Sequence, residues 1–280
     1  MNSYKIGLVM KSLQADFFIS MKNGALQYSK EHPEIELLCC GTDSQIEIDE
    51  QIELVNSLIE EKVDGIVLVP IDSKALVDSV VRAVKSGIPV INIDIKLDEE
   101  LLKENNVDVA FVGPDNFEAA YEVGKLLCAK LNVADEVAVI EGLKGADNAL
   151  MRKEGFMKAI AESNLHVVAS ETANWETFNA ERIFNDILKK HPSLKGVFCS
   201  NDAMALGVLK AMDDNEKYLP LVGFDNDVSI NRYLKNGRLI GTVDIYSSSM
   251  AVHGIEFLLD VLKGVKHNKG NYSTPFKIIT

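Results

Sequence analysis

The chain has 280 residues, of which 47% are hydrophobic and 25% charged, a composition typical of a folded globular protein and not of a disordered or fibrous one. Lys and Arg total 29 against 42 Asp and Glu, so the formal net charge is -13, which argues against nucleic acid and anionic membranes as partners. No apolar run reaches the ~18 residues of a membrane span.

The amino-terminal sequence MNSYKIGLVMKSL lacks the basic region, long apolar core and small-residue cleavage site of a signal peptide. We therefore expect either a cytoplasmic protein or one whose leader is absent from this chain. The four cysteines are too few for a disulfide framework, and no Cys/His spacing predicts a zinc site. We expect free thiols and no metal.

Short apolar runs alternate along the chain with segments whose apolar residues recur three and four positions apart. The predicted strands are 4–10, 35–40, 65–70, 89–94, 109–113, 136–142, 166–172, 196–200, 220–225 and 239–245. The predicted helices between them include 18–29, 46–61, 75–85, 116–130 and 180–190. This alternation predicts an α/β fold with parallel strands covered on both faces by helices, in a doubly wound arrangement.

The order of elements starts again in the second half of the chain. Residues 1–94 are predicted to run β-α-β-α-β-α-β, and residues 136–225 repeat that order. Ten strands are many for one open sheet, so we expect two similar lobes joined by crossovers at 95–116, 241–246 and 270–276. The expected N-terminal lobe is 1–113 plus 246–271, and the expected C-terminal lobe is 114–245 plus 272–280.

Polar and aromatic residues gather just after the predicted strands. In open α/β sheets, ligands bind beyond the carboxyl ends of the strands, so these residues are the candidates for a binding site. They are Lys11, Asp16, Phe17, Phe18, Asp94, Asn148, Arg152, Trp175, Asn201 and Asp225. Their shared placement is the signal, since no single one of them is diagnostic.

Several of these residues also have a purely structural interpretation. Asp is favoured at helix starts, so Asp94 and Asp225 can be caps, and Asp202 is the expected cap of the helix that follows 196–200. Phe17 and Phe18 can form a core pair at the start of a helix.

The remaining candidates are equally open when taken alone. Arg152 can pair with a surface acid such as Glu154, and Lys11 can be solvated. Trp175 follows a strand and does not belong to a core pattern, so both a ligand-facing and a core position are open for it.

Motifs of catalysis are absent from the sequence. There is no GxGxxG, GxxxxGK[ST], GxSxG or HExxH, and no His lies beside a Ser, Cys or carboxylate in a triad pattern. We therefore expect a protein that is not an enzyme and that carries no cofactor.

In these residues the chain resembles the type I periplasmic sugar-binding proteins, the substrate-binding subunits of ribose- and galactose-type ABC transporters. The resemblance covers nearly the whole chain. It rests on IGLVMKSLQADFFISMKNGA near the start, DGIVLVPIDSKAL at 64–76, SGIPVINID at 86–94, MRKEGF at 151–156, GVFCSNDAMALGVLKAM at 196–212, LVGFDN at 221–226 and NGRLIGTVDI at 236–245. It implies the same two lobes, joined by a three-crossover hinge.

The resemblance also implies a function. The protein would capture a monosaccharide or related polyol between two closing lobes and deliver it to the membrane permease of an ABC transporter. It would be periplasmic, or extracellular and membrane-anchored. Phe17 and Trp175 would sandwich the sugar ring, and Asn148 matches an acid of galactose-type members. The residues that would hold the hydroxyls are Asp94, Arg152, Asn201 and Asp225.

The chain departs from the family pattern at several positions near the expected site, namely Lys11, Ala15, Asp16, Ile95 and Ile245. Ile95 stands where ribose and galactose binders carry a cation, and Ile245 stands where they carry Gln or Asn. A deoxysugar, a pentose, a polyol, a cyclitol and a substituted sugar therefore all remain open as ligands.

Two other functions use the same fold. One is a binding protein that reports to a membrane sensor kinase. The other is the effector domain of a LacI-type repressor, which the missing helix-turn-helix and the negative charge disfavour.

Overall fold

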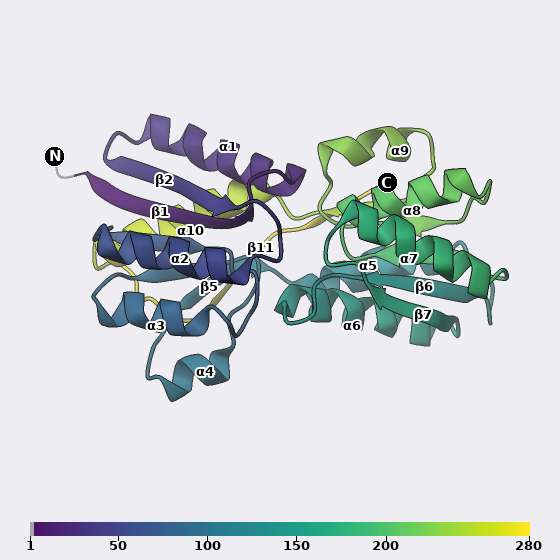
Figure 1. Cartoon of the computed structure of the whole chain (residues 1–280), viewed down its shortest axis with the longest axis horizontal. Helices are drawn as coiled ribbons and strands as arrows, with labels where there is room; N and C mark the ends of the chain where they lie inside the picture. The colour runs from purple at the N-terminus through teal and green to yellow at the C-terminus, as the bar shows by residue number, and fades with distance from the viewer. Residues whose placement is uncertain (1–2) are drawn as a thin grey trace. The chain divides into compact units, whose positions relative to one another are not determined.

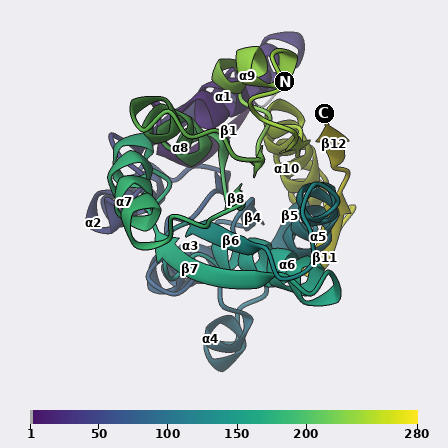
Figure 2. The ribbon, with the colours of Figure 1, turned by 90° about the vertical axis from the view of Figure 1, so that its right-hand side faces the viewer.

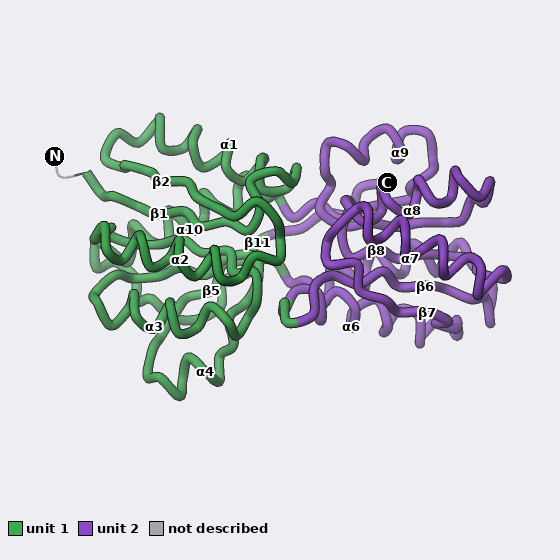
Figure 3. Tube along the Cα trace, in the orientation of Figure 1, with its two compact units in different colours: residues 1–114, 145–147, 246–274 green, residues 115–144, 148–245, 275–280 purple. Residues whose placement is uncertain are grey.

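Two parallel β-sheets organise the chain, each in a unit of its own. The structure, a computed structural model, describes residues 3–280. Unit 1 comprises the residues up to 114 together with 145–147 and 246–274, and unit 2 comprises 115–144, 148–245 and 275–280 (Figure 3). These two units are defined by how closely their residues pack together. The expected lobes are instead parts of the chain that move separately, and their boundaries stay a prediction.

Unit 1 contains a six-stranded sheet in the order β11-β5-β4-β3-β1-β2, with all neighbours parallel (Figure 1). Its elements are β1 (Tyr4–Ser12), α1 (Asp16–Glu31), β2 (Ile35–Thr42), α2 (Ile48–Glu60), β3 (Gly65–Leu68), α3 (Val77–Lys85), β4 (Val90–Ile93), α4 (Glu99–Glu104), β5 (Ala110–Pro114), α10 (Ser247–Leu262) and β11 (Asn271–Thr274).

Unit 2 repeats the strand order of unit 1 in a four-stranded parallel sheet, β7-β6-β8-β9. Its elements are α5 (Asn116–Cys128), β6 (Glu136–Glu141), α6 (Asp147–Glu162), β7 (His166–Thr172), α7 (Thr177–Lys190), β8 (Gly196–Cys199), α8 (Asp202–Asp214), β9 (Leu221–Val222), η1 (Val228–Ile230), α9 (Asn231–Lys235), β10 (Thr242–Asp244) and β12 (Lys277–Ile279). The last two strands, β10 and β12, pair antiparallel.

Helices cover both faces of each sheet, so the prediction of two doubly wound α/β lobes is confirmed. In unit 1, α2 and α3 pack with the strands in one apolar cluster, and α10 lies against β3 and β4 together with α1. In unit 2, α7 and α8 lie on one side of the strands, and α5 and α6 on the other (Figure 2). The strands β3 and β8 are buried along their whole length, which explains why they read as apolar runs with no alternation.

The strands near the carboxyl end of the chain differ from the prediction. The run 220–225 forms a strand only at Leu221–Val222, because Asp225 and Asn226 take positive φ angles of 108° and 56° and leave the extended conformation. The segment 270–276 was expected only as a crossover, but it contains β11. The chain passes from unit 1 to unit 2 between β11 and β12. Because β11 pairs with β5, residues 271–274 lie in unit 1.

The structure also bears on the cysteines, on membrane-spanning helices and on metal ligands. All four cysteines are free thiols, as expected, and burial raises the pKa of Cys40 to about 12. Among residues 3–280, no helix is both long enough and apolar enough to cross a membrane. The same residues hold no group of three side chains arranged to ligate a metal.

Candidate functional site

The unit 1 candidates lie beyond the carboxyl ends of β1 and β4. Lys11 is buried near the end of β1, and its Nζ lies 5.4 Å from the centroid of the Phe18 ring. Phe17 and Phe18 are both buried in the first turn of α1 and meet edge to face, with centroids 5.0 Å apart. Asp16, next to them, is exposed, and there its charge stabilises the start of α1.

The loops after β1 and β3 are tied together by a residue that the sequence analysis missed. Gln51 on α2 is completely buried. Its Nε2 donates to the carbonyls of Met10 at 3.2 Å and Val69 at 2.8 Å, and its Oε1 accepts from the Ile71 N–H at 2.7 Å. These bonds fix the backbone beside Lys11. A glutamine within an acidic helix carries no signal of this role in the sequence.

Asp94 follows β4 directly and is buried with a positive φ of 63°. It does not cap a helix, because the cap of α4 is Asp98, whose carboxylate accepts from the Leu101 N–H at 2.9 Å. The capping interpretation is also wrong for Asp225, since Asp227 stands at the start of η1. Both residues instead follow the fourth strand of their units, and both have a positive φ.

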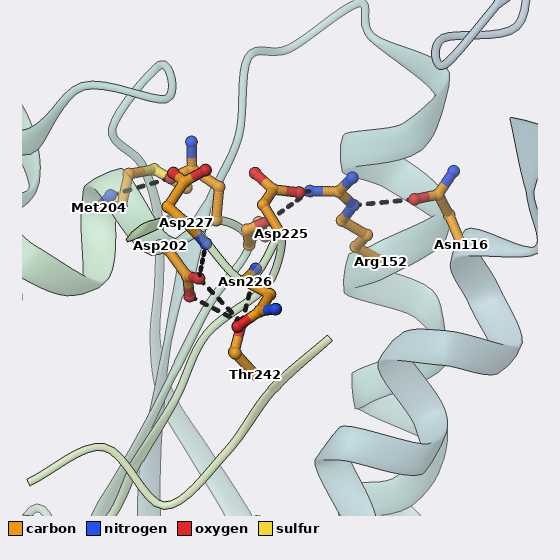
Figure 4. A network of polar contacts seen from close by, with 10 residues as sticks. Asn116, Arg152, Asp202, Met204, Asp225, Asn226, Asp227 and Thr242 are labelled. Atoms are coloured by element: carbon orange, nitrogen blue, oxygen red, sulfur yellow. Dashed lines mark hydrogen bonds and ion pairs between the residues drawn. The ribbon is translucent and has the colours of Figure 1, made fainter. Parts of the chain in front are cut away.

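Arg152 is the centre of a buried network in unit 2 (Figure 4). Its side chain is only 2% exposed. Nε donates to Asn116 Oδ1 at 2.9 Å, and Nη1 donates to the Ser200 carbonyl at 2.7 Å and to Asp225 Oδ1 at 3.2 Å. The guanidinium also lies 3.7 Å from the centroid of the Phe224 ring. Arg152 thus pairs with a buried acid and not with Glu154 on the surface.

Trp175 lies beside this network after β7, where Asn174 and Trp175 both take positive φ angles of 55° and 67°. The indole is 3% exposed, and its ring lies 5.6 Å from the Arg152 guanidinium. Gly142, after β6, leaves the space for the indole, because a Cβ there would overlap the ring. Asn148 is buried on α6, one helical turn before Arg152.

The start of α8 reverses the expected roles of two neighbouring residues. Asn201 is the cap, with its Oδ1 accepting from the Met204 N–H at 2.9 Å, so the prediction that Asp202 caps this helix is wrong. Asp202 is instead fully buried and accepts from the Thr242 hydroxyl at 2.9 Å and the Asp227 N–H at 3.0 Å (Figure 4). Burial, followed by the charge of Asp225, raises the pKa of the Asp202 carboxyl well above its ordinary value.

Each unit therefore brings part of the predicted set together. In unit 1, Lys11 and the two phenylalanines contact one another, whereas in unit 2, Arg152 contacts both Trp175 and Asp225. Guanidinium and ammonium groups donate, carboxylates accept, and aromatic faces cover apolar C–H surface. This combination suits a small ligand that carries several hydroxyl groups.

Comparison with known proteins agrees with this chemistry. A D-ribose/D-allose-binding protein of Pseudomonas aeruginosa is 38% identical, with 99% of this chain and 88% of the relative covered. A solved ABC transporter solute-binding protein from Burkholderia multivorans is 38% identical, covers all of both chains and superposes with a TM-score of 0.97. Another from Actinobacillus succinogenes, with bound D-allose, is 31% identical, covers 99% of this chain and 97% of its own, and has a TM-score of 0.93.

The comparison with family models covers most of the chain. Residues 6–266 match the family model described as a periplasmic binding protein domain, and this range includes every candidate binding residue named above. The chain belongs to the periplasmic binding protein domain family.

Proposed function

We propose that this protein is the sugar-binding subunit of an ABC importer and that it takes an aldose of the D-ribose/D-allose class. The observation that carries the proposal is the setting of Arg152. Three of its five N–H donors are held by Asn116, Ser200 and Asp225. These three bonds fix the guanidinium, and its planar fork lets the N–H groups of Nη2 donate to ligand hydroxyls.

The other candidates complete a set of donors and acceptors. The carboxylates of Asp94 and Asp225 accept hydrogen bonds from sugar hydroxyls, and the rings of Phe17 and Trp175 cover the C–H faces of the sugar. Since Asn201 uses its Oδ1 as a helix cap, it serves the ligand through its Nδ2 donors. Asn148 and Lys11 add further polar contacts, while Phe18 packs against Lys11 and Asp16 lies at the edge of the set.

The permease of an ABC transporter is the proposed membrane partner. The two solved structures named above are ABC transporter solute-binding proteins, which favours import over the sensing and repressor alternatives. The proposal places the protein in the periplasm or at the outer face of the cytoplasmic membrane, held there by an anchor. It gives the protein a binding role and no catalytic one.

A thermal-shift screen followed by calorimetry tests the ligand class. D-allose and D-ribose should raise the unfolding temperature, and D-glucose, D-fucose and xylitol should do so less. A sugar at 100 times its Kd adds about 2.7 kcal/mol of stability, which is a shift of several degrees for a chain of this size. No shift with any sugar or polyol would overturn the proposal.

A pair of tyrosine and tryptophan variants locates the site. Trp175→Ala should weaken sugar binding by roughly tenfold or more, because the loss of one stacked ring removes about 1.5–3 kcal/mol of apolar burial. Tyr218→Ala is the matched control, since Tyr218 is 61% exposed and precedes β9, whereas Asp225 follows it. Equal affinities for the two variants would show that Trp175 does not contact the sugar.

A further inference from the structure

Asp94 lies at the apex of a three-residue turn directly after β4. The Ile95 N–H donates to the Ile93 carbonyl at 2.8 Å, and Asp94 between them has a φ of 63°. This is a γ-turn with a positive φ at its central residue, a conformation that is rare and strained. Strained backbone persists only where the surrounding structure holds it. The turn that presents this carboxylate therefore needs a brace.

Asn92 supplies that brace from inside the sheet. Its side chain is 1% exposed and lies on β4, two residues before Asp94. Nδ2 donates to the Ile95 carbonyl at 2.7 Å, and Oδ1 accepts from the Leu97 N–H at 2.8 Å. Both partners lie beyond Asp94 in the chain, so the carboxamide links β4, which precedes Asp94, to the backbone that follows it. Buried backbone groups are almost always paired, and here the carboxamide pairs the Ile95 carbonyl and the Leu97 N–H.

We infer that Asn92 is a positioning residue for sugar binding. Its carboxamide holds the 93–97 turn so that the Asp94 carboxylate is set in advance to accept hydrogen bonds from the ligand. This inference rests on the proposed sugar-binding function. If loss of the brace leaves the turn in its binding conformation about one tenth of the time, the Kd rises about tenfold.

Hydrogen exchange tests the brace without any ligand. Asn92→Ala should speed amide exchange in peptides covering residues 93–98. Asn268→Ala is the matched control, because its Nδ2 donates to the Val90 carbonyl at 3.1 Å and its Oδ1 accepts from the Ala110 N–H at 3.0 Å. It thus removes two hydrogen bonds between a side chain and the backbone, at the starts of β4 and β5 and away from residues 93–98. Unchanged exchange at 93–98 in Asn92→Ala would overturn the inference.

A double-mutant cycle with D-allose, followed by calorimetry, tests whether Asn92 acts through Asp94. Asp94→Gly removes the carboxylate and keeps the turn, because glycine takes positive φ without strain. Asn92→Ala should weaken binding about tenfold in the original chain and less than about twofold in the Asp94→Gly chain.

The cycle separates the two levels of the argument. Equal losses in both backgrounds, or an equal loss for Asn268→Ala, would mean that Asn92 has only a structural role. Failure of D-allose to bind the unchanged chain would instead count against the proposed function, and the exchange rates at 93–98 would then decide alone whether Asn92 holds the turn.

Discussion

Replacing Arg152 by Met should destabilise unit 2 far more than an ordinary surface substitution does. The Met side chain reaches about as far as Nε of Arg, so the change mainly removes the guanidinium. Asn116 Oδ1, the Ser200 carbonyl and the Asp225 carboxylate then lose their donors at 2.9, 2.7 and 3.2 Å. The largest cost comes from Asp225, whose side chain is 8% exposed and loses its ion pair with Arg152.

The size of the effect follows from these contacts. Breaking a buried ion pair by removing one partner costs about 3–5 kcal/mol, and hydrogen bonds to charged groups contribute about 1.5–3 kcal/mol each, with large overlap between the two figures. We expect a loss of about 3–5 kcal/mol in the free energy of unfolding. This corresponds to a fall of roughly 10–15 °C in Tm.

Scanning calorimetry without sugar measures this loss, with Arg232→Met as the control at an exposed arginine of the same unit. Adding Asp225→Asn to Arg152→Met should restore at least about 1 kcal/mol, because it removes a buried carboxylate that has lost its ion pair with Arg152. Two results would refute the reasoning. One is a loss below about 1 kcal/mol for Arg152→Met, and the other is simple additivity of the two substitutions.

Two further substitutions, Gly142→Ala and Asp202→Asn, test the space for the Trp175 indole and the buried carboxyl group of Asp202. Gly142→Ala should push the Trp175 indole out of place and weaken sugar binding by roughly tenfold, with little change in Tm. Titration calorimetry measures the affinity, and thermal unfolding measures the Tm. An unchanged affinity would contradict the packing of Trp175 against Gly142. The pKa of Asp202 is raised in the folded chain, so its contribution to stability is lost as pH rises from about 4 towards that raised pKa. Asp202→Asn should therefore flatten the fall in unfolding free energy between pH 5 and pH 8, measured by urea unfolding, and an unchanged slope would show that Asp202 does not carry the effect.

The sequence predicts the sheets well because a strand buried on both faces has no polar positions to interrupt its pattern. The run GIVL of β3 and the run GVFC of β8 are such strands. The pattern fails for β11, whose NYST residues lie at the sheet edge and are mostly exposed, so that backbone pairing alone defines the strand. Helix starts are ambiguous in the same way, as the adjacent polar pair Asn201 and Asp202 shows.

Site residues are predictable where their position in the chain carries the signal, as for a polar side chain directly after a strand. Arg152 and Asp225 were found in this way, and the structure brings them into contact. Gln51, Asn92 and Gly142 were not found, because each acts by holding a backbone or a ring in place. Such a role depends on which distant groups the fold brings near, and a single sequence does not contain that information.

The path of the chain through the two units has a consequence for the order in which they fold during synthesis. In unit 1, α10 covers β3 and β4, and β11 completes the sheet at its edge, yet both come from residues 247–274. In unit 2, β10 pairs with β12, which is formed by Lys277–Ile279. Domains that are continuous in sequence can fold as soon as they leave the ribosome. Here most of unit 1 is synthesised first, but the part of its sheet that α10 covers stays open until almost the whole chain has emerged. The interval exposes apolar strands, so a chaperone that delays their association is of most use to this protein before residue 247 is made.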